Sequence, residues 1–349
     1  MNFRLSLSSQ KTMVPPQSRP VSNSDALLDK ILSDPKLPSA PSVALRIVEL
    51  VSDPECEIDK VIQLLSTDAA ICAQLLKTLN SSLYALSRPV TSVKRAVAIL
   101  GLHPLRSIVL GLALPALQTR VKKDDGLRRF WRSSVAAAII ARELAITQRD
   151  PLYEEAFIAC LLCDLGTVIL YQTIPKSYEP AWSGRERVFG EALCAWEMRH
   201  LGIEHPTVSA GLLKRWRLPP EIVEPVRYHH CVDDAEDQPP HIRQRTALLS
   251  FSHQVASIDE VKPKDVLPGL IEEAGTTFGM NKQEFMNFLK DVRPKIEAFA
   301  ELLQVDIGQC PNYAEVVSLG CNELLRLSLE IEKPPSMSGA KTKPDQRPN

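Results

Sequence analysis

Three histidines and one aspartate are the residues of this chain whose types and spacing could do chemistry. Asp164 is followed by His205, His229 and His230, and each histidine lies at or near the end of an expected helix. Imidazoles and a carboxylate are ligands of Mn, Fe or Zn ions, which can polarise a phosphate and ionise a bound water. The same side chains can also serve the fold, as hydrogen-bonding partners of Asp164 and of helix ends. The residue types alone leave a metal-dependent hydrolase and a structural histidine cluster both open.

Cys160 and Cys163 form a CxxC pair close to Asp164. A redox function would require a thioredoxin-like βαβ context, and a zinc site of this type would require a second CxxC pair. Neither is present, so we interpret the pair as part of a buried helix. The eight cysteines lie mostly in apolar helical patterns. This favours reduced thiols in the cytoplasm over a secreted disulfide framework.

The elements that position these residues are expected to be helices throughout. Apolar residues recur at helical spacing in nearly every segment, and strict alternation is almost absent. Asp68 is expected to open one helix, and Ser92 to cap another that ends at Gly101. With 349 residues, 44% apolar residues, 14 glycines and 5% aromatics, the chain is long enough for a large core and unlike a β-sandwich. The predicted fold class is all-α, a multi-helical bundle with a C-terminal helical extension.

The second half of the chain should contain long helices separated by polar loops. We expect helices over about 127–148, 152–171, 189–201, 206–217, 220–230, 241–257, 281–303 and 312–332, with loops at 173–187 and 232–240. The charged segment 122–126 suggests a boundary. The predicted organisation is a disordered basic tail (1–24), an N-terminal helical part (25–125), a helical subdomain (126–257), C-terminal helices (258–332) and a disordered tail (333–349).

Charge and hydropathy argue against nucleic acid and membranes as partners. The net charge is −1, which gives no general attraction to polyanions. The segment 92–114 has the outline of a helix-turn-helix, but its second helix offers only Arg106 among apolar residues, so a buried hairpin is expected. Apolar runs such as 108–114 are too short to span a bilayer, and the N-terminus lacks an apolar signal core. We expect a cytoplasmic protein.

Motifs in one order over about residues 30–256 resemble the HDOD domain. The resemblance includes the segment Leu37-Pro-Ser-Ala-Pro-Ser-Val43 and an ordered series of single residues. These are Asp68, Asn80, Gly101, Trp131, Asp164, Gly166, Glu197, His205, Trp216, Pro219, His229 and His230.

The resemblance implies an all-helical, HD-like signalling domain of bacterial regulators. Such domains are related to HD and HD-GYP phosphohydrolases but are usually regarded as lacking their activity. The HD pattern requires an early His, a His-Asp pair, later histidines and a final Asp. Here the early position falls at Ser133 or Ser134, and the pair is Cys163-Asp164. The final position falls near Ser252-His253, where there is no acid.

These replacements remove both charge and ligands, so we expect no catalytic residue and no metal. If an ion of Mn, Fe or Zn does bind, its ligands would be Asp164, His205, His229 and His230, with Cys163 replacing the His of the pair. The expected function is a non-catalytic signal-transduction module that binds partner proteins or a small ligand. Response regulators or diguanylate-cyclase-type proteins are the partners that the family suggests. The alternative is a metal-dependent phosphohydrolase or phosphodiesterase of the HD superfamily with a degenerate site.

The segment 312–332 carries a separate pattern. Apolar or small residues recur at alternating spacings of four and three, at Tyr313, Val317, Gly320, Leu324, Leu327 and Ile331. This pattern predicts either a homodimer seam or an amphipathic helix that packs on its own domain.

Overall fold

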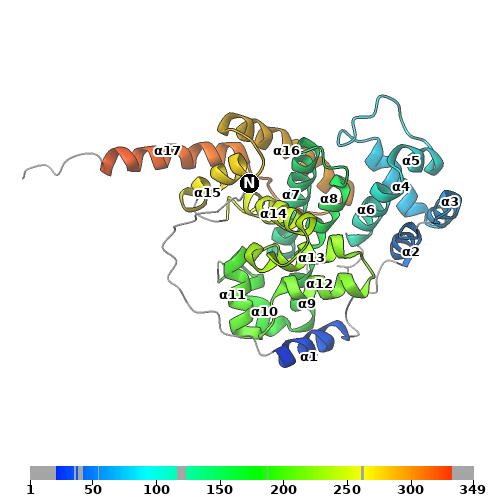
Figure 1. The fold of residues 1–349 in the computed structure, drawn as a ribbon, viewed down its shortest axis with the longest axis horizontal. Helices are drawn as coiled ribbons and strands as arrows, with labels where there is room; N and C mark the ends of the chain where they lie inside the picture. The colour runs from blue at the N-terminus through cyan, green and yellow to red at the C-terminus, as the bar shows by residue number, and fades with distance from the viewer. Residues whose placement is uncertain are drawn as a thin grey trace, which may run out of the picture.

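The computed structural model describes residues 21–34, 37, 42–53, 55–115, 123–186, 188–260 and 263–331, and none of these is in a β-strand. The predicted all-α fold is therefore confirmed (Figure 1). The helices are α1 (Val21–Leu32), α2 (Ser42–Val51), α3 (Ile58–Ser66), α4 (Ala69–Leu79), α5 (Val93–Leu100), α6 (Leu102–Ala113), α7 (Asp125–Thr147), α8 (Tyr153–Leu162), α9 (Leu165–Thr173), α10 (Pro175–Trp182), α11 (Gly190–Leu201), α12 (His205–Arg215), α13 (Pro220–Tyr228), the 3-10 helix η2 (Val232–Ala235), α14 (Pro240–Ala256), α15 (Pro263–Thr276), α16 (Lys282–Leu303) and α17 (Tyr313–Ile331).

The N-terminal helices begin and end where the capping residues predict. Asp68 accepts hydrogen bonds from the backbone amides of Ala70 and Ile71 at the start of α4. Ser92 caps α5 in the same way, and Gly101, with φ of 75°, ends it before the chain turns by 119° into α6. Helix α6 is buried from Leu105 to Ala113, so it is core material as expected.

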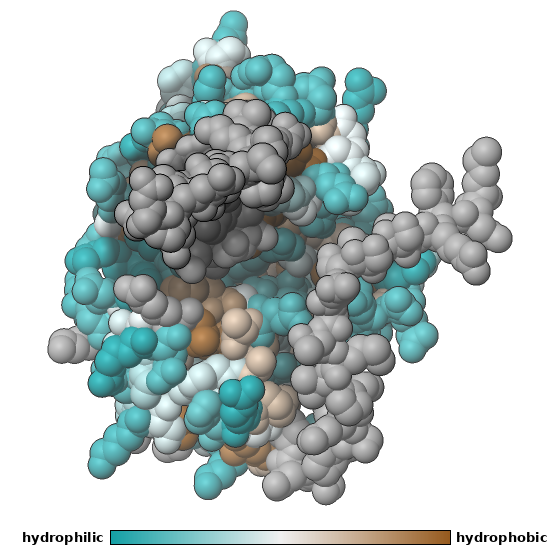
Figure 2. Space-filling model, turned by 90° about the vertical axis from the view of Figure 1, so that its left-hand side faces the viewer, coloured by the Kyte–Doolittle hydropathy of each residue, from teal (hydrophilic) through white to brown (hydrophobic). Residues whose placement is uncertain are grey.

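Helix α7 is the central helix of the second half and packs mainly against α8 and α14. Helix α8 also packs against α6, which joins the N-terminal helices to this half. The buried apolar residues accordingly form one cluster that runs from Ile31 to Cys321. The face of the molecule shown in Figure 2 is mainly hydrophilic, with a smaller hydrophobic area near its centre.

The prediction of one continuous helix over 152–171 is wrong. Helix α8 ends at Leu162, Cys163 and Asp164 form a turn, and α9 begins at Leu165. The hydroxyl of Ser209 stabilises the turn, because it donates to the Cys163 carbonyl at 2.6 Å and accepts from the Gly166 amide at 2.7 Å. A Cβ atom at Gly166 would lie 2.2 Å from the carbonyl oxygen of His205, so glycine allows α9 and α12 to approach closely. This break in the helix places Asp164 at the centre of the site.

The stretch Tyr153–Thr173, which contains this turn, is long and apolar enough to cross a membrane, although the sequence patterns did not reveal such a run. Its most apolar window is 72% buried inside the protein. Such burial is typical of a pair of helices in a protein core. The stretch is apolar because most of its side chains pack inside the protein.

Three other segments differ from expectation. The loop predicted at 173–187 contains α10, which has Pro175 in its first turn and buries Tyr178 and Trp182, four residues apart on one face. Helix α15 was not expected from the sequence pattern. Helix α1 begins at Val21, within the predicted tail. The rest of both predicted tails, and residues 38–41 of the Leu37–Val43 motif, lie outside the described residues.

Candidate functional site

Four histidines from three helices surround the carboxylate of Asp164. His205 comes from the start of α12, His229 and His230 follow α13, and His253 lies near the end of α14. Oδ1 of Asp164 lies 3.2 Å from His205 Nε2, 3.4 Å from His229 Nε2 and 3.9 Å from His230 Nε2. Oδ2 lies 3.6 Å from His253 Nδ1. The two oxygens of one carboxylate therefore face two different groups of histidines.

His205 is held by a second carboxylate behind it. Its Nδ1 and its backbone amide both lie 2.8 Å from Oε2 of Glu197, and the hydroxyl of Tyr178 donates to the other oxygen of Glu197. His205 and Glu197 are both fully buried. The Nε2 of His205 is paired with Asp164, whose Oδ1 lies 3.2 Å away. A carboxylate that holds one ring nitrogen of a histidine, so that the other nitrogen is directed into the site, is the arrangement that orients metal-binding imidazoles.

His229 is oriented in a comparable way. Its Nδ1 lies 2.7 Å from the carbonyl oxygen of Val226, so it donates to that carbonyl and leaves Nε2 directed at Asp164. Its neighbour His230 packs 3.9 Å away, ring centre to ring centre. The HH pair thus contributes one firmly oriented imidazole and a second, partly exposed one.

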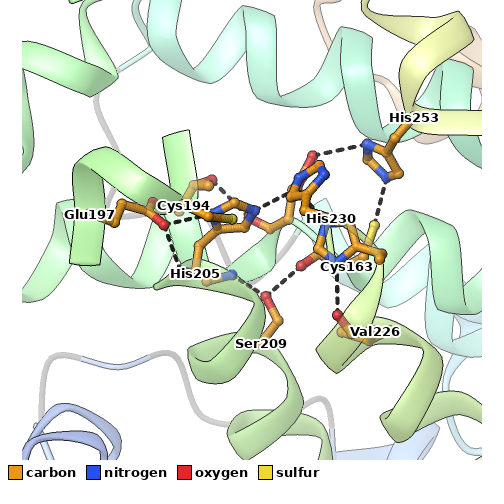
Figure 3. A network of polar contacts seen from close by, with 12 residues as sticks. Cys163, Cys194, Glu197, His205, Ser209, Val226, His230 and His253 are labelled. Atoms are coloured by element: carbon orange, nitrogen blue, oxygen red, sulfur yellow. Dashed lines mark hydrogen bonds and ion pairs between the residues drawn. The ribbon is translucent and has the colours of Figure 1, made fainter. Parts of the chain in front are cut away.

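Cys163 and His253 form a pair on the other side of the cluster, as Figure 3 shows. Cys163 Sγ lies 2.7 Å from His253 Nε2 and 2.7 Å from the carbonyl oxygen of Cys160. Both side chains are buried. The thiol that replaces the histidine of the HD pair therefore contacts the histidine near the position of the missing final acid.

Burial and charge divide the ionisable groups of the site into two kinds. Burial raises the pKa of Asp164, but the surrounding histidines, with His253 first, outweigh it and hold this pKa well below its usual range. Burial lowers the pKa of His229 to about 4 and that of His230 well below its usual value. Near neutral pH we therefore expect an ionised Asp164 that faces two neutral imidazoles.

The other two histidines have raised pKa values. Burial acts to lower the pKa of His205, but the Glu197 carboxylate and other neighbours outweigh it and raise the pKa well above its usual value. The pKa of His253 rises to about 9, because Cys163 and Asp164 outweigh burial. Burial also raises the pKa of the Cys163 thiol well above its usual value.

A small cavity of about 110 Å³ opens onto the cluster. Asp164, His230 and His253 line it, together with Ser133 and Arg129. Of the two serines that could occupy the early HD position, Ser133 thus faces the site. Ser134 does not line the cavity and is fully buried.

The donor set fits one metal ion. One donor atom from each of Asp164, His205, His229 and His230 can be chosen so that all four lie within 4.8 Å of one another. Ligand atoms about 2.0–2.1 Å from a tetrahedral ion lie about 3.3 Å apart, which agrees with the distances from Asp164 to His205 and His229. These distances are also long for hydrogen bonds. At the early position of the HD pattern Ser133 supplies only a hydroxyl, which is a weaker ligand than imidazole for such ions.

The structure brings together about half of the residues singled out from the sequence. Asp164, Gly166, Glu197, His205, His229 and His230 form or support the site, as described above. The other six serve the fold: Asp68 and Gly101 delimit helices, Asn80 bonds the backbone of Val90, Trp131 and Trp216 are buried, and Pro219 precedes α13.

Sequence reasoning missed the part that His253 plays. The HD pattern has an acid at this position, so the pattern does not indicate the imidazole as a ligand. Tyr178 and Ser209 were missed because one lies in a segment predicted as a loop and the other contacts the site across helices.

The helical architecture and the cluster define an HD-like domain. The chain belongs to the HDOD domain family, because the family model matches residues 37–232, which is more than half of its 349 residues.

Solved structures of low sequence identity share the fold. An HDOD domain protein of unknown function from Geobacter sulfurreducens has a TM-score of 0.56 and 22% identity, with 90% of this chain and 98% of that chain covered. A candidate phosphohydrolase from Shewanella amazonensis has a TM-score of 0.57 and 22% identity, with coverages of 85% and 94%. A candidate signal transduction protein from Marinobacter aquaeolei has a TM-score of 0.52 and 23% identity, with coverages of 90% and 62%.

One curated relative matches in sequence, an uncharacterized protein from Treponema pallidum. It is 23% identical over 273 residues, which cover 76% of this chain. The match covers 52% of the relative, so the chain spans about half of its length.

Proposed function

We propose that this chain is a non-catalytic signal-transduction module of the HDOD type, which binds partner proteins or a small ligand in the cytoplasm. The observation that carries the proposal is the ligand set around Asp164. Ser133 stands where the HD pattern has its early histidine, and the thiol of Cys163 is bonded to His253 instead of facing the cavity. Ligands for a two-ion hydrolytic centre are therefore incomplete.

The partners follow from the family and are also part of the proposal. The candidate signal transduction protein from Marinobacter aquaeolei supports a signalling function for this fold. Response regulators or diguanylate-cyclase-type proteins are the partners we propose. A homodimer through 312–332 is also part of the proposal, but Tyr313, Val317 and Gly320 of its seam are buried in the chain itself and so are not open to a partner.

A turnover assay tests the non-catalytic function. The full-length chain, supplemented in turn with Mn, Fe and Zn, would be incubated with cyclic dinucleotides and simple phosphate esters. We expect no hydrolysis above that of an Asp164→Ala variant. Turnover that disappears in Asp164→Ala would overturn the proposal.

The second candidate is a metal-dependent phosphohydrolase, which one specific observation favours. His205 is held by Glu197 through Nδ1 and directs its Nε2 toward Asp164, 3.2 Å away. An ion bound by Asp164, His205, His229 and His230 would supply a Lewis acid and a bound water of lowered pKa. This candidate predicts metal-dependent turnover that is lost in His229→Ala, and absence of turnover in every metal-supplemented assay would exclude it.

A further inference from the structure

Cys163 and His253 direct donor atoms toward Asp164, yet the HD pattern has neither a cysteine nor a histidine at these positions. Cys163 Sγ, one oxygen of Asp164 and one ring nitrogen each of His229 and His253 lie within 4.8 Å of one another. Cys163 and His229 are fully buried, and His253 is 3% exposed. These four side chains form a compact donor set that contains sulfur.

We propose that this set binds one divalent ion of the zinc class, through Cys163, Asp164, His229 and His253. Thiolate sulfur, imidazole nitrogen and carboxylate oxygen are the ligands that zinc takes in proteins. The thiolate and the carboxylate together balance the two positive charges of the ion, which favours binding in a buried place. Two protons are released to solvent when the ion binds, the thiol proton of Cys163 and one ring proton of His253, because a metal-binding imidazole must be neutral.

The distances suit such an ion. In a tetrahedral zinc site, bonds of about 2.0–2.1 Å to nitrogen and oxygen and about 2.3 Å to sulfur place the ligand atoms about 3.3–3.6 Å apart. The distance of 3.4 Å from Asp164 Oδ1 to His229 Nε2 is of this size, and one donor atom from each of the four residues can be chosen so that all lie within 4.8 Å of one another. His253 would give its Nε2 to the ion, because that nitrogen lies 2.7 Å from Cys163 Sγ, while its Nδ1 faces Oδ2 of Asp164. The ion would move Nε2 and Sγ apart by less than about 1 Å.

The nitrogen-and-oxygen set of Asp164, His205, His229 and His230 competes for the same ion. His229 has one free ring nitrogen, because its Nδ1 donates to Val226, so it can join only one set at a time. A soft ligand such as thiolate selects zinc-class ions over Mn. His230 is also the most distant ligand of the competing set, at 3.9 Å from Asp164.

Four protein ligands leave no coordination position for water. A closed site of this kind stabilises the fold and does not activate water. The ion would tie the turn between α8 and α9 to α13 and α14. A structural ion of this kind agrees with the proposed non-catalytic function. Only this structural interpretation of the ion, and not its ligand set, rests on that proposed function.

Cobalt substitution tests the ligand set. Co²⁺ bound to a thiolate gives a sulfur-to-metal charge-transfer absorption in the near ultraviolet, which a nitrogen-and-oxygen site lacks. We expect one Co²⁺ per full-length chain, with this absorption, displaced by Zn²⁺. Cys163→Ser should lose the absorption and bind Zn²⁺ more than about 10-fold more weakly. Cys160→Ser is the matched control, because it removes the other buried thiol of the CxxC pair, and it should keep the absorption.

Two results would overturn the proposal. One is Co²⁺ that binds without the charge-transfer absorption and is lost in His205→Ala or His230→Ala, which would assign the ion to the competing set. The other is a wild-type chain that binds no Co²⁺ or Zn²⁺. If Cys163→Ser does not fold, His253→Gln decides, with an expected loss of more than about 10-fold in affinity. Because the turnover assay tests function and the spectrum tests ligands, failure of one is distinguishable from failure of the other.

Discussion

Asp164 is held at the centre of its histidine cluster by small neighbours that do no chemistry themselves. Gly166 lets the start of α9 lie against the start of α12, and Ser209 bonds both sides of the turn that carries Asp164. Both features join residues of different helices, and each of them involves backbone atoms. The geometry of the cluster therefore depends on close packing as much as on the titratable residues.

Gly166→Ala should destabilise the protein, although alanine normally favours a helix. The added Cβ would lie 2.2 Å from the backbone oxygen of His205, which cannot rotate away. We expect a loss of about 1–3 kcal/mol in the free energy of unfolding, measured with urea. Gly269→Ala is the control, because Gly269 is helical with nothing within 4 Å of its Cβ position, and it should gain about 0.5–1 kcal/mol. Equal effects at both positions would contradict the packing argument.

Residue types predicted part of this site. Residue type and place in the ordered series of motifs were enough to single out Asp164, His205, His229 and His230. His253 could not be singled out, because nothing in its local sequence distinguishes it from an ordinary helical histidine. Its proximity to Cys163 depends on how α14 packs against the turn that follows α8, which is a tertiary property.

At the scale of elements, the sequence predicts helix ends that are marked by capping residues. It does not predict a turn that interrupts an apolar run. Asp68, Ser92 and Gly101 mark helix ends by chemistry within a few residues. The turn at Cys163-Asp164 lies in a run that is apolar on both sides, so its periodicity resembles one helix. The distant Ser209 hydroxyl bonds this turn, and a local pattern does not contain that information.

Asn80 illustrates an element junction that can be tested. Its side chain donates to the carbonyl of Val90 at 2.8 Å and accepts from the amide of Val90 at 2.7 Å, which joins the end of α4 to the segment before α5. Asn80→Ala would leave both groups of the buried Val90 without these partners, so urea unfolding should show a loss of about 1–3 kcal/mol. The exposed Asn287→Ala should change stability by less than about 0.5 kcal/mol. A neutral Asn80→Ala would show that water replaces the bonds at no cost.

At the scale of the molecule, the predicted boundary near residue 125 does not divide the core. Buried apolar residues from both sides of it form one cluster, and α6 packs directly against α8. The charged segment 122–126 indicated a boundary in the sequence. How the helical blocks share a core depends on packing between elements far apart in the sequence.

Unfolding should therefore be one cooperative transition for both parts. All four tryptophans, Trp131, Trp182, Trp196 and Trp216, lie between residues 126 and 257, so their fluorescence reports on that part alone. Circular dichroism reports on helices throughout the chain. We expect the two probes to give the same urea midpoint, and two separate midpoints would show that the parts unfold independently.

The most direct test of the site as a whole is the number of metal ions per chain. Full-length protein purified without chelators would be measured by plasma mass spectrometry beside Asp164→Ala. One zinc-class ion per wild-type chain, absent from Asp164→Ala, is the predicted result. Two ions per chain would contradict it by indicating a two-ion hydrolytic centre, and none would show that the cluster is held together by hydrogen bonds and ion pairs alone.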